Sequence, residues 1–166
     1  MEYWDVYDVN REKTGRIVER HSDDWLKENE YHLGIHIAIF NSKNEMLIQK
    51  RSLNKRANPG KWDFSGRGSV VKGETSQEGA RRELLEELGF DFDFSNERAR
   101  FTINCENLFD DYYIIKQDIN LDELVLQKEE VDAVKWASKE EIIDMIDNDE
   151  FAEKNVELMK FIFSLF

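Results

Sequence analysis

The stretch that decides the fold is residues 68–90, which reads GSVVKGETSQEGARRELLEELGF. Its second half predicts an α-helix from Thr75 to Leu88, because Ala80, Leu84 and Leu88 recur at i, i+4 and i+8 and form an apolar stripe. The glycine that follows at once is typical of a helix C-cap. The stretch therefore predicts a loop followed by an amphipathic helix.

Three carboxylates crowd beside that stripe. Glu83, Glu86 and Glu87 fall within an arc of roughly 100°, and like charges at this spacing weaken a helix. Arg82 pairs with Glu86 at i,i+4, which leaves Glu83 and Glu87 without an obvious partner. A hard divalent cation would offset their repulsion, since Mg²⁺ takes oxygen ligands and shares them with substrate phosphates. For the glutamates alone, a solvated helix face is the simpler interpretation.

The residues around the glutamates change that interpretation. Residues 68–90 match every fixed position of the Nudix box, G-x5-E-x7-R-E-U-x-E-E-x-G-U, in which U is a bulky apolar residue. The matching residues are Gly68, Glu74, Arg82, Glu83, Leu84, Glu86, Glu87, Gly89 and Phe90. The chain thus resembles the Nudix hydrolases. The resemblance implies an α/β (α+β) fold, an α/β/α sandwich with a mixed central sheet, formed by residues 1–166 as a single domain.

The resemblance also implies a chemistry. Nudix hydrolases cleave a diphosphate linkage in a small molecule, which here would be a nucleoside diphosphate derivative or a nucleoside di- or triphosphate. Mg²⁺ is the implied cofactor, with Mn²⁺ as the alternative. The implied metal ligands are the carboxylates of Glu83, Glu86 and Glu87 and the backbone carbonyl of Gly68. Arg82 and Glu74 are expected to orient those carboxylates through a salt bridge.

The general base is left open between two positions. Glu83 is one candidate within the box. Outside the box, the preferred acids are Glu130 and its neighbour Glu129, which precede a predicted strand. Asp110 and Asp111 are the next choice. Each of these outside acids has a plain alternative as a surface charge.

A basic cluster precedes the box in this acidic protein. Its members are Lys50, Arg51, Lys55, Arg56, Lys61 and Arg67. Such residues either hold substrate phosphates, which the arginine fork fits, or form a solvated loop. Arg51, Arg67 and Trp62 are the candidate substrate-binding residues, Trp62 by stacking on a base or, alternatively, as a core aromatic residue.

Further segments resemble the Nudix subgroup related to isopentenyl-diphosphate isomerase. They are residues 4–8 (WDVYD), 31–33 (YHL), 48–52 (IQKRS) and 58–63 (NPGKWD). That isomerase needs a cysteine soon after its tryptophan, and residues 63–69 contain none. Cys105 lies on another predicted strand, where a buried structural role is the default. Isomerase activity is therefore disfavoured. A Nudix domain that binds a nucleotide without turnover is the other alternative, and the complete box favours the enzyme.

Composition bounds the remaining possibilities. The chain has 166 residues, of which 40% are apolar, and this length suits one domain. A formal net charge of −13 argues against a polymeric nucleic acid as partner, because binding one needs clustered cations. With a single cysteine, no apolar run of about 18 residues and no leader, we expect a cytoplasmic protein that does not enter a membrane. The expected partner is a small phosphorylated molecule, and the oligomeric state is open.

The pattern of the rest of the chain predicts strands and helices in alternation. Strands are expected at residues 4–8, 33–40, 46–49, 101–103, 111–115 and 131–136. Helices are expected at residues 22–29, after Ser138 with a capping box, and within residues 151–166. Residues 51–73 read as a long loop. His32 and His36 share a strand face, either as structural residues or as a zinc pair.

Overall fold

The computed structural model describes residues 2–165 of the chain. Its strands are β1 (Tyr3–Tyr7), β2 (Lys13–Glu19), β3 (His32–Phe40), β4 (Met46–Arg51), β5 (Trp62–Asp63), β6 (Gly66–Ser69), β7 (Phe101–Cys105), β8 (Leu108–Lys116) and β9 (Val131–Ala137). Its helices are α1 (Ser76–Leu88), the 3-10 turn η1 (Leu121–Glu123), α2 (Lys139–Asp147) and α3 (Val156–Phe163). None of the helices in residues 2–165 is both long and apolar enough to cross a bilayer.

The central sheet is mixed, as expected. β3 runs parallel to β8 and antiparallel to β4 and β6. The strand order is β5-β4-β3-β8-β7, with β6 beside β3 and β9 beside β4. Because β3 lies inside the sheet and is covered on both faces, eight of its nine residues are buried.

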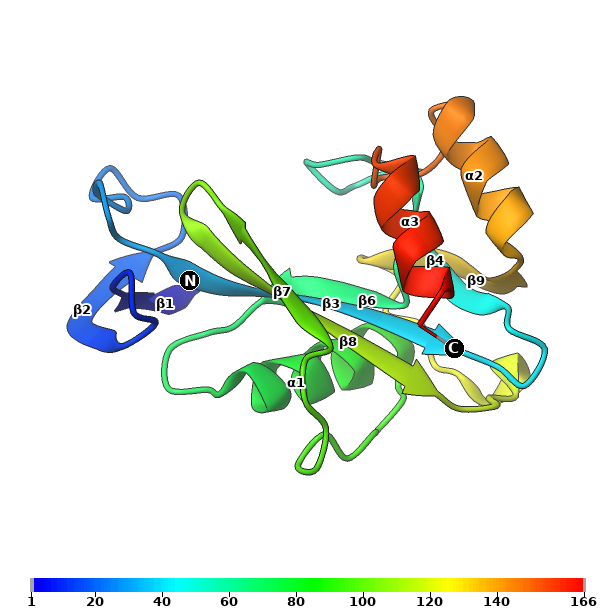
Figure 1. Cartoon of the computed structure of the whole chain (residues 1–166), viewed down its shortest axis with the longest axis horizontal. Helices are drawn as coiled ribbons and strands as arrows, with labels where there is room; N and C mark the ends of the chain where they lie inside the picture. The colour runs from blue at the N-terminus through cyan, green and yellow to red at the C-terminus, as the bar shows by residue number, and fades with distance from the viewer. Residues whose placement is uncertain (1, 166) are drawn as a thin grey trace.

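Helices cover both faces of this sheet, which makes the α/β/α sandwich (Figure 1). On one face, Ile35 and Ile37 of β3 share a core cluster with Leu84 and Leu88 of α1. On the other face, Phe40 belongs to a second cluster with residues of α2 and α3. Alternate residues of one strand thus enter different cores, which is the period-2 geometry of a strand.

The helix of the box begins and ends where the sequence predicts, within one residue. Thr75 is the N-cap, and its side chain and that of Glu78 form a reciprocal capping box. Gly89 closes the helix at φ 64°, in the left-handed region that a side chain disfavours. The capping box of Ser138 and Glu141 likewise starts α2. The C-terminal helix is shorter than residues 151–166, since α3 begins at Val156; Phe166 lies outside the described residues.

The prediction of a helix at residues 22–29 is wrong. These residues form turns and bends. Asn29 has a φ of 61°, and the guanidinium of Arg16 donates to the carbonyls of Asp24 and Trp25. A distant side chain therefore satisfies carbonyl groups that a helix would have used for its own hydrogen bonds.

The structure corrects two further predictions and adds one strand. Residues 51–73 are not one loop, because β5 and β6 lie within them and β6 pairs with β3. The glycines of β6 carry no strand signal, and the neighbouring strand supplies the hydrogen bonds. Strand β2 was not expected. Cys105 is exposed rather than buried, since it ends β7, which is at the edge of the sheet.

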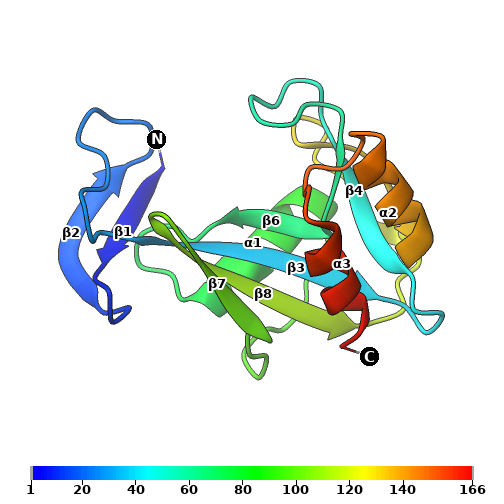
Figure 2. The ribbon, with the colours of Figure 1, turned by 45° about the horizontal axis from the view of Figure 1, so that its top comes forward.

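The N-terminal hairpin of β1 and β2 is a sheet of its own at one end of the molecule (Figure 2). Its small core consists of Trp4, Val6, Val18 and Leu26. Two hydrogen bonds tie the hairpin to the loop before α1. The amide of Lys72 donates to the carbonyl of Tyr3 (2.7 Å), and the amide of Gly73 donates to the carboxylate of Asp5 (2.8 Å).

Candidate active site

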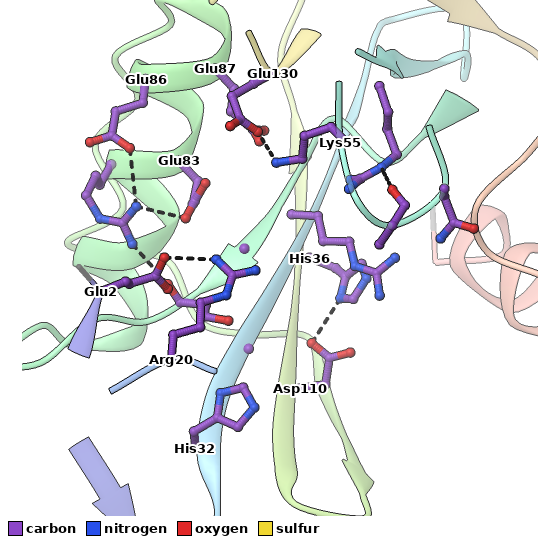
Figure 3. Close-up of a pocket in the computed structure, with 18 of the residues that line it drawn as sticks. Glu2, Arg20, His32, His36, Lys55, Glu83, Glu86, Glu87, Asp110 and Glu130 are labelled. Atoms are coloured by element: carbon purple, nitrogen blue, oxygen red, sulfur yellow. Dashed lines mark hydrogen bonds and ion pairs between the residues drawn. The ribbon is translucent and has the colours of Figure 1, made fainter. Parts of the chain in front are cut away.

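The carboxylates of α1 border a cavity of about 410 Å³. Its walls come from α1, β3, β6, the loop after β4, the segment before β9 and the N-terminal hairpin (Figure 3). Of the residues predicted from sequence, the cavity brings together Arg51, Arg67, Gly68, Arg82, Glu83, Glu86, Glu87 and Glu130. Trp62 is not among the lining residues.

Glu87 is the most buried of the three glutamates. Its residue is 7% exposed, and its carboxylate accepts a hydrogen bond of 2.8 Å from the side-chain amide of Gln49 on β4. Burial, and then the charge of Glu83, raise the pKa of Glu87 to about 8. An ionised carboxylate with a single neutral donor is costly in such a place. The position therefore favours a cation beside it.

Arg82 holds the other two glutamates and the loop before the helix. Its Nε donates to Glu74 (2.8 Å), and its terminal nitrogens contact Glu83 (2.8 Å), Glu86 (3.4 Å) and the carbonyl of Ser69 (3.0 Å). These contacts engage the whole guanidinium fork. Arg82 therefore orients carboxylates and has little capacity left for a substrate.

Gly68 lies directly against the side chain of Glu83. A Cβ built on Gly68 would overlap the Glu83 carboxylate, so a larger residue here would displace that side chain from its present position. The glycine near the end of β6 thus leaves room for Glu83, and its own backbone angle is not left-handed. This close approach places a backbone carbonyl and a carboxylate at the same wall of the cavity.

The oxygen donors at this wall are of the kind that a hard divalent cation takes. As the side chains stand, no three acid, imidazole or thiol groups within residues 2–165 converge closely enough to hold an ion. Glu83 and Glu86 are turned to Arg82, and Glu87 is turned to Gln49. Binding an ion would therefore require these side chains to rotate while the helix stays in place.

His32 and His36 do not form a metal pair. The ring of His32 stacks on Trp4 at 4.0 Å, and burial lowers its pKa to about 4. His36 is buried, its Nδ1 is 2.9 Å from a carboxylate oxygen of Asp110, and its ring stacks on Tyr112. Both imidazoles thus serve contacts within the protein, the simpler of the two sequence interpretations.

The acids considered as outside bases lie in different surroundings. Glu130 lines the cavity and forms an ion pair with Lys55, close to Glu87 in Figure 3. Asp110 also lines it, bonded to His36. Asp111 instead points into the protein and accepts hydrogen bonds from Arg11, Ser76 and Thr102, and Glu129 does not line the cavity.

Two of the cationic residues share one buried carboxylate. A terminal nitrogen of Arg51 lies 3.1 Å from Asp63, and one of Arg67 lies 3.7 Å from the same oxygen. Two guanidinium groups on one carboxylate leave a net positive charge at this wall, as a phosphate site needs. Trp62 is outside this arrangement, because its ring packs in the second core and lies beneath Lys135.

Several lining residues were not found from the sequence. They include Glu2, Arg20 and Gln127, which belong to no motif. Gln49, which bonds Glu87 without lining the cavity, was not singled out either. Gln49 had a weak signal, as a polar residue that ends the apolar run Met46–Ile48 on a buried strand. Glu2 and Arg20 had none, because only the docking of the hairpin brings them to the cavity.

Comparison with known proteins agrees with this geometry. The NUDIX domain family model matches residues 30–159. An uncharacterized Nudix hydrolase of Listeria monocytogenes is 46% identical over 151 residues, which are 91% of this chain and 88% of that protein. An isopentenyl-diphosphate Delta-isomerase of Corynebacterium diphtheriae is 25% identical over 134 residues, 73% of this chain and 71% of the isomerase. A crystal structure from Deinococcus radiodurans shares the fold, with a TM-score of 0.79 at 22% identity, over 97% of this chain and 99% of that one.

Proposed function

The chain belongs to the Nudix hydrolase family, and we propose that it uses Mg²⁺ to cleave a diphosphate linkage in a small phosphorylated molecule. A nucleoside diphosphate derivative or a nucleoside di- or triphosphate is the proposed substrate. The observation that carries the proposal is the buried carboxylate of Glu87 at a cavity wall that also holds Glu83, Glu86 and Gly68. Those carboxylates and the carbonyl of Gly68 are the proposed ligands, with Mn²⁺ as the alternative ion. When bound, such an ion neutralises diphosphate oxygens and activates a water for attack at phosphorus.

The residues of the chain itself divide the remaining work. Arg82 keeps Glu83 and Glu86 at the cavity through its salt bridges and is anchored by Glu74. Arg51 and Arg67 hold phosphate oxygens with the positive charge that Asp63 leaves uncancelled. Glu130 is the proposed proton acceptor for the attacking water. It lines the cavity, forms an ion pair with Lys55 and lies close to Glu87 (Figure 3), so its carboxylate is placed to take the proton of a water bound at the glutamates.

Isomerase activity has less support. No cysteine lies in residues 63–69, and Cys105, on the edge strand β7, is not among the residues that line the cavity. The carbon chemistry of an isomerase would therefore lack a thiol at this site. A binding domain without turnover is the other alternative. The box is complete in sequence, and its Arg82, Glu83, Glu86 and Glu87 all line the cavity, which favours catalysis.

The decisive experiment is turnover of a substrate panel. The protein is incubated with Mg²⁺ and nucleoside diphosphates and triphosphates, nucleotide sugars and dinucleoside polyphosphates. We expect release of phosphate or nucleoside monophosphate from at least one of them, and loss of that release when the metal is chelated. Tight binding of a panel member with no product from any would contradict the proposal and favour the binding domain.

We also propose that residues 1–166 act as one domain in the cytoplasm and that the partner is the small substrate and not a polymeric nucleic acid. The net charge of −13 supports the second point. Gel filtration with light scattering would determine the oligomeric state, on which the sequence is silent.

A further inference from the structure

The N-terminal hairpin supplies part of the cavity wall, although it lies outside the region that the family model matches. The matched region begins at residue 30. Glu2, beside β1, and Arg20, directly after β2, nevertheless line the same cavity as the glutamates of α1. Figure 3 shows both side chains next to each other and near Glu83. The hairpin is therefore placed to contact whatever occupies the cavity.

A chain of contacts fixes the position of the Arg20 guanidinium. One terminal nitrogen donates to the carboxylate of Glu2 at 2.9 Å, and the other carboxylate oxygen accepts from the indole of Trp4 at 2.7 Å. The guanidinium also lies 5.8 Å from the centre of the Trp4 ring, whose indole stacks on His32. Burial acts to raise the pKa of Glu2, but the hydrogen bonds from Trp4 and Arg20 outweigh it and lower that pKa. The ionised carboxylate of Glu2 therefore fixes the position of the Arg20 guanidinium.

Arg20 retains more hydrogen-bonding capacity than Arg82 or Arg51. Within residues 2–165, the Arg20 guanidinium has Glu2 as its single polar partner. The side chain of Arg20 is 45% exposed. Arg82, by contrast, contacts three carboxylates and a carbonyl, and Arg51 is 13% exposed and bonded to Asp63 and the carbonyl of Ala57. A guanidinium with a free edge fits the paired oxygens of a phosphate.

The hairpin is also held against the loop that leads into α1. Two hydrogen bonds join the two segments. The backbone amide of Lys72 donates to the carbonyl of Tyr3, and that of Gly73 donates to the carboxylate of Asp5. Arg20 therefore belongs to a hairpin that is hydrogen-bonded to the Nudix box loop, so its guanidinium keeps a defined position relative to the glutamates. Such preorganisation lowers the entropic cost of binding.

We propose that Arg20 binds a phosphate group of the substrate from the hairpin side of the cavity, with Glu2 as the residue that positions it. The inference rests on the proposed function, since it takes the occupant of the cavity to be a diphosphate. It adds a substrate-binding residue that lies outside the family-matched region and outside the box. The diphosphate would then be held between the metal ligands of α1 and this guanidinium.

The test compares three substitutions in the full-length protein. Arg20→Gln removes the charge and the fork, Glu2→Gln keeps an oxygen that accepts from Arg20, and Lys13→Ala removes an exposed cation of the same hairpin that does not line the cavity. The probe is imidodiphosphate with Mg²⁺, whose P–N–P link resists hydrolysis, and its Kd is measured by calorimetry. We expect Arg20→Gln to raise the Kd by about 10- to 100-fold. Glu2→Gln should raise it by a smaller factor, because the amide oxygen can still accept from Arg20, and Lys13→Ala should leave it close to the wild type.

A purely structural role gives a different pattern. If the Arg20–Glu2 pair only closed the wall, Arg20→Gln and Glu2→Gln would break the same ion pair and weaken binding equally. That result, or an unchanged Kd for Arg20→Gln, would overturn the inference, as would a wild type that does not bind the probe. Should Arg20→Gln fail to fold by circular dichroism, Arg20→Lys keeps the charge without the fork and is expected to raise the Kd less, while a Kd equal to the wild type would overturn the inference.

Turnover separates this inference from the proposed function. With a substrate found in the panel, Arg20→Gln should raise KM by a similar factor and leave kcat within a few-fold. If the wild type binds imidodiphosphate through Arg20 but cleaves no panel member, the proposed hydrolysis fails and the phosphate-binding role of Arg20 stands.

Discussion

Glu87 shows what a single residue of this site contributes and what it costs. Its carboxylate is 7% exposed and accepts one hydrogen bond, from Gln49. Burial raises its pKa to about 8, because the charged form loses its hydration. Without a cation, the ionised form destabilises the folded protein. The sequence placed this glutamate beside the apolar stripe of a helix, but its burial depends on β4, which lies far away in the chain.

We predict that Glu87→Gln lowers turnover by orders of magnitude, on the order of 10²-fold or more, and leaves the fold intact. In chelated protein the same change should not lower the free energy of unfolding and is expected to raise it, because a neutral amide replaces the buried carboxylate. Steady-state kinetics and denaturant unfolding with EDTA measure the two effects. Glu140→Gln, on the exposed side of α2, is the control for removal of a glutamate charge. Unchanged turnover in Glu87→Gln would mean that the metal assignment is wrong.

At the scale of elements, Asp111 joins three segments of the chain. It lies on β8 and is 1% exposed. Arg11, in the turn between β1 and β2, binds both of its oxygens, and the hydroxyls of Ser76 on α1 and Thr102 on β7 donate to it at 2.6 Å each. The carboxylate thus fastens the N-terminal hairpin and the start of the box helix to the sheet.

Asp111→Asn should therefore destabilise the protein by about 2 kcal/mol at pH 7, since a buried carboxylate that accepts charge-assisted hydrogen bonds from the partly exposed Arg11 is lost. Burial alone would raise the pKa of Asp111, but the bonds from Arg11, Ser76 and Thr102 lower it below its usual value. A carboxylate with a lowered folded pKa stabilises the protein above its unfolded pKa, and that contribution is lost as the pH falls through the folded pKa. The difference in free energy of unfolding between the wild type and Asp111→Asn should thus become smaller below about pH 4.

Denaturant unfolding at pH 7 and pH 3 measures both parts of this prediction. Asp91→Asn is the matched control, because Asp91 pairs with Arg81 at the surface, where both side chains are about half exposed and such pairs contribute little. A difference between wild type and Asp111→Asn that is as large at pH 3 as at pH 7 would show that the ionised carboxylate is not the source of the stability.

The elements also show where sequence reasoning succeeds and where it fails. α1 and the start of α2 were predicted closely because their signals are local: an apolar period and a C-cap glycine for α1, and a capping box for α2. The helix expected at residues 22–29 does not form, since Arg16 takes up carbonyls there. β6 was missed because its glycine-rich sequence becomes a strand through its pairing with β3. Non-local partners decided both cases.

Over the whole molecule, the net charge of −13 produces self-repulsion, which bound or screening cations reduce. An ion that binds the folded chain and not the unfolded one adds about 2.7 kcal/mol at 100 times its Kd. We therefore predict that Mg²⁺ raises the Tm by roughly 5–10 °C for a chain of this size. Thermal unfolding with Mg²⁺ and with NaCl of equal ionic strength separates specific binding from screening.

The double variant Glu86→Gln/Glu87→Gln is the control for this measurement. It should lose the greater part of the Mg²⁺ shift while keeping the response to NaCl. An equal Mg²⁺ shift in the wild type and the double variant would place the bound ion elsewhere on the acidic surface.

The sequence by itself determined the box helix, its C-cap glycine and the set of glutamates, because these depend on spacing along one stretch of chain. The mixed α/β fold followed from the resemblance of that stretch to the Nudix family. Only the tertiary structure decided which charges meet. Folding buries Glu87 against Gln49 and brings Arg51 and Arg67 to Asp63. It leaves Asp111 and Trp62 outside the cavity. It also brings Arg20 from the hairpin to the box. Such contacts join residues tens of positions apart, and their burial and geometry arise only when the sheet and the hairpin pack together.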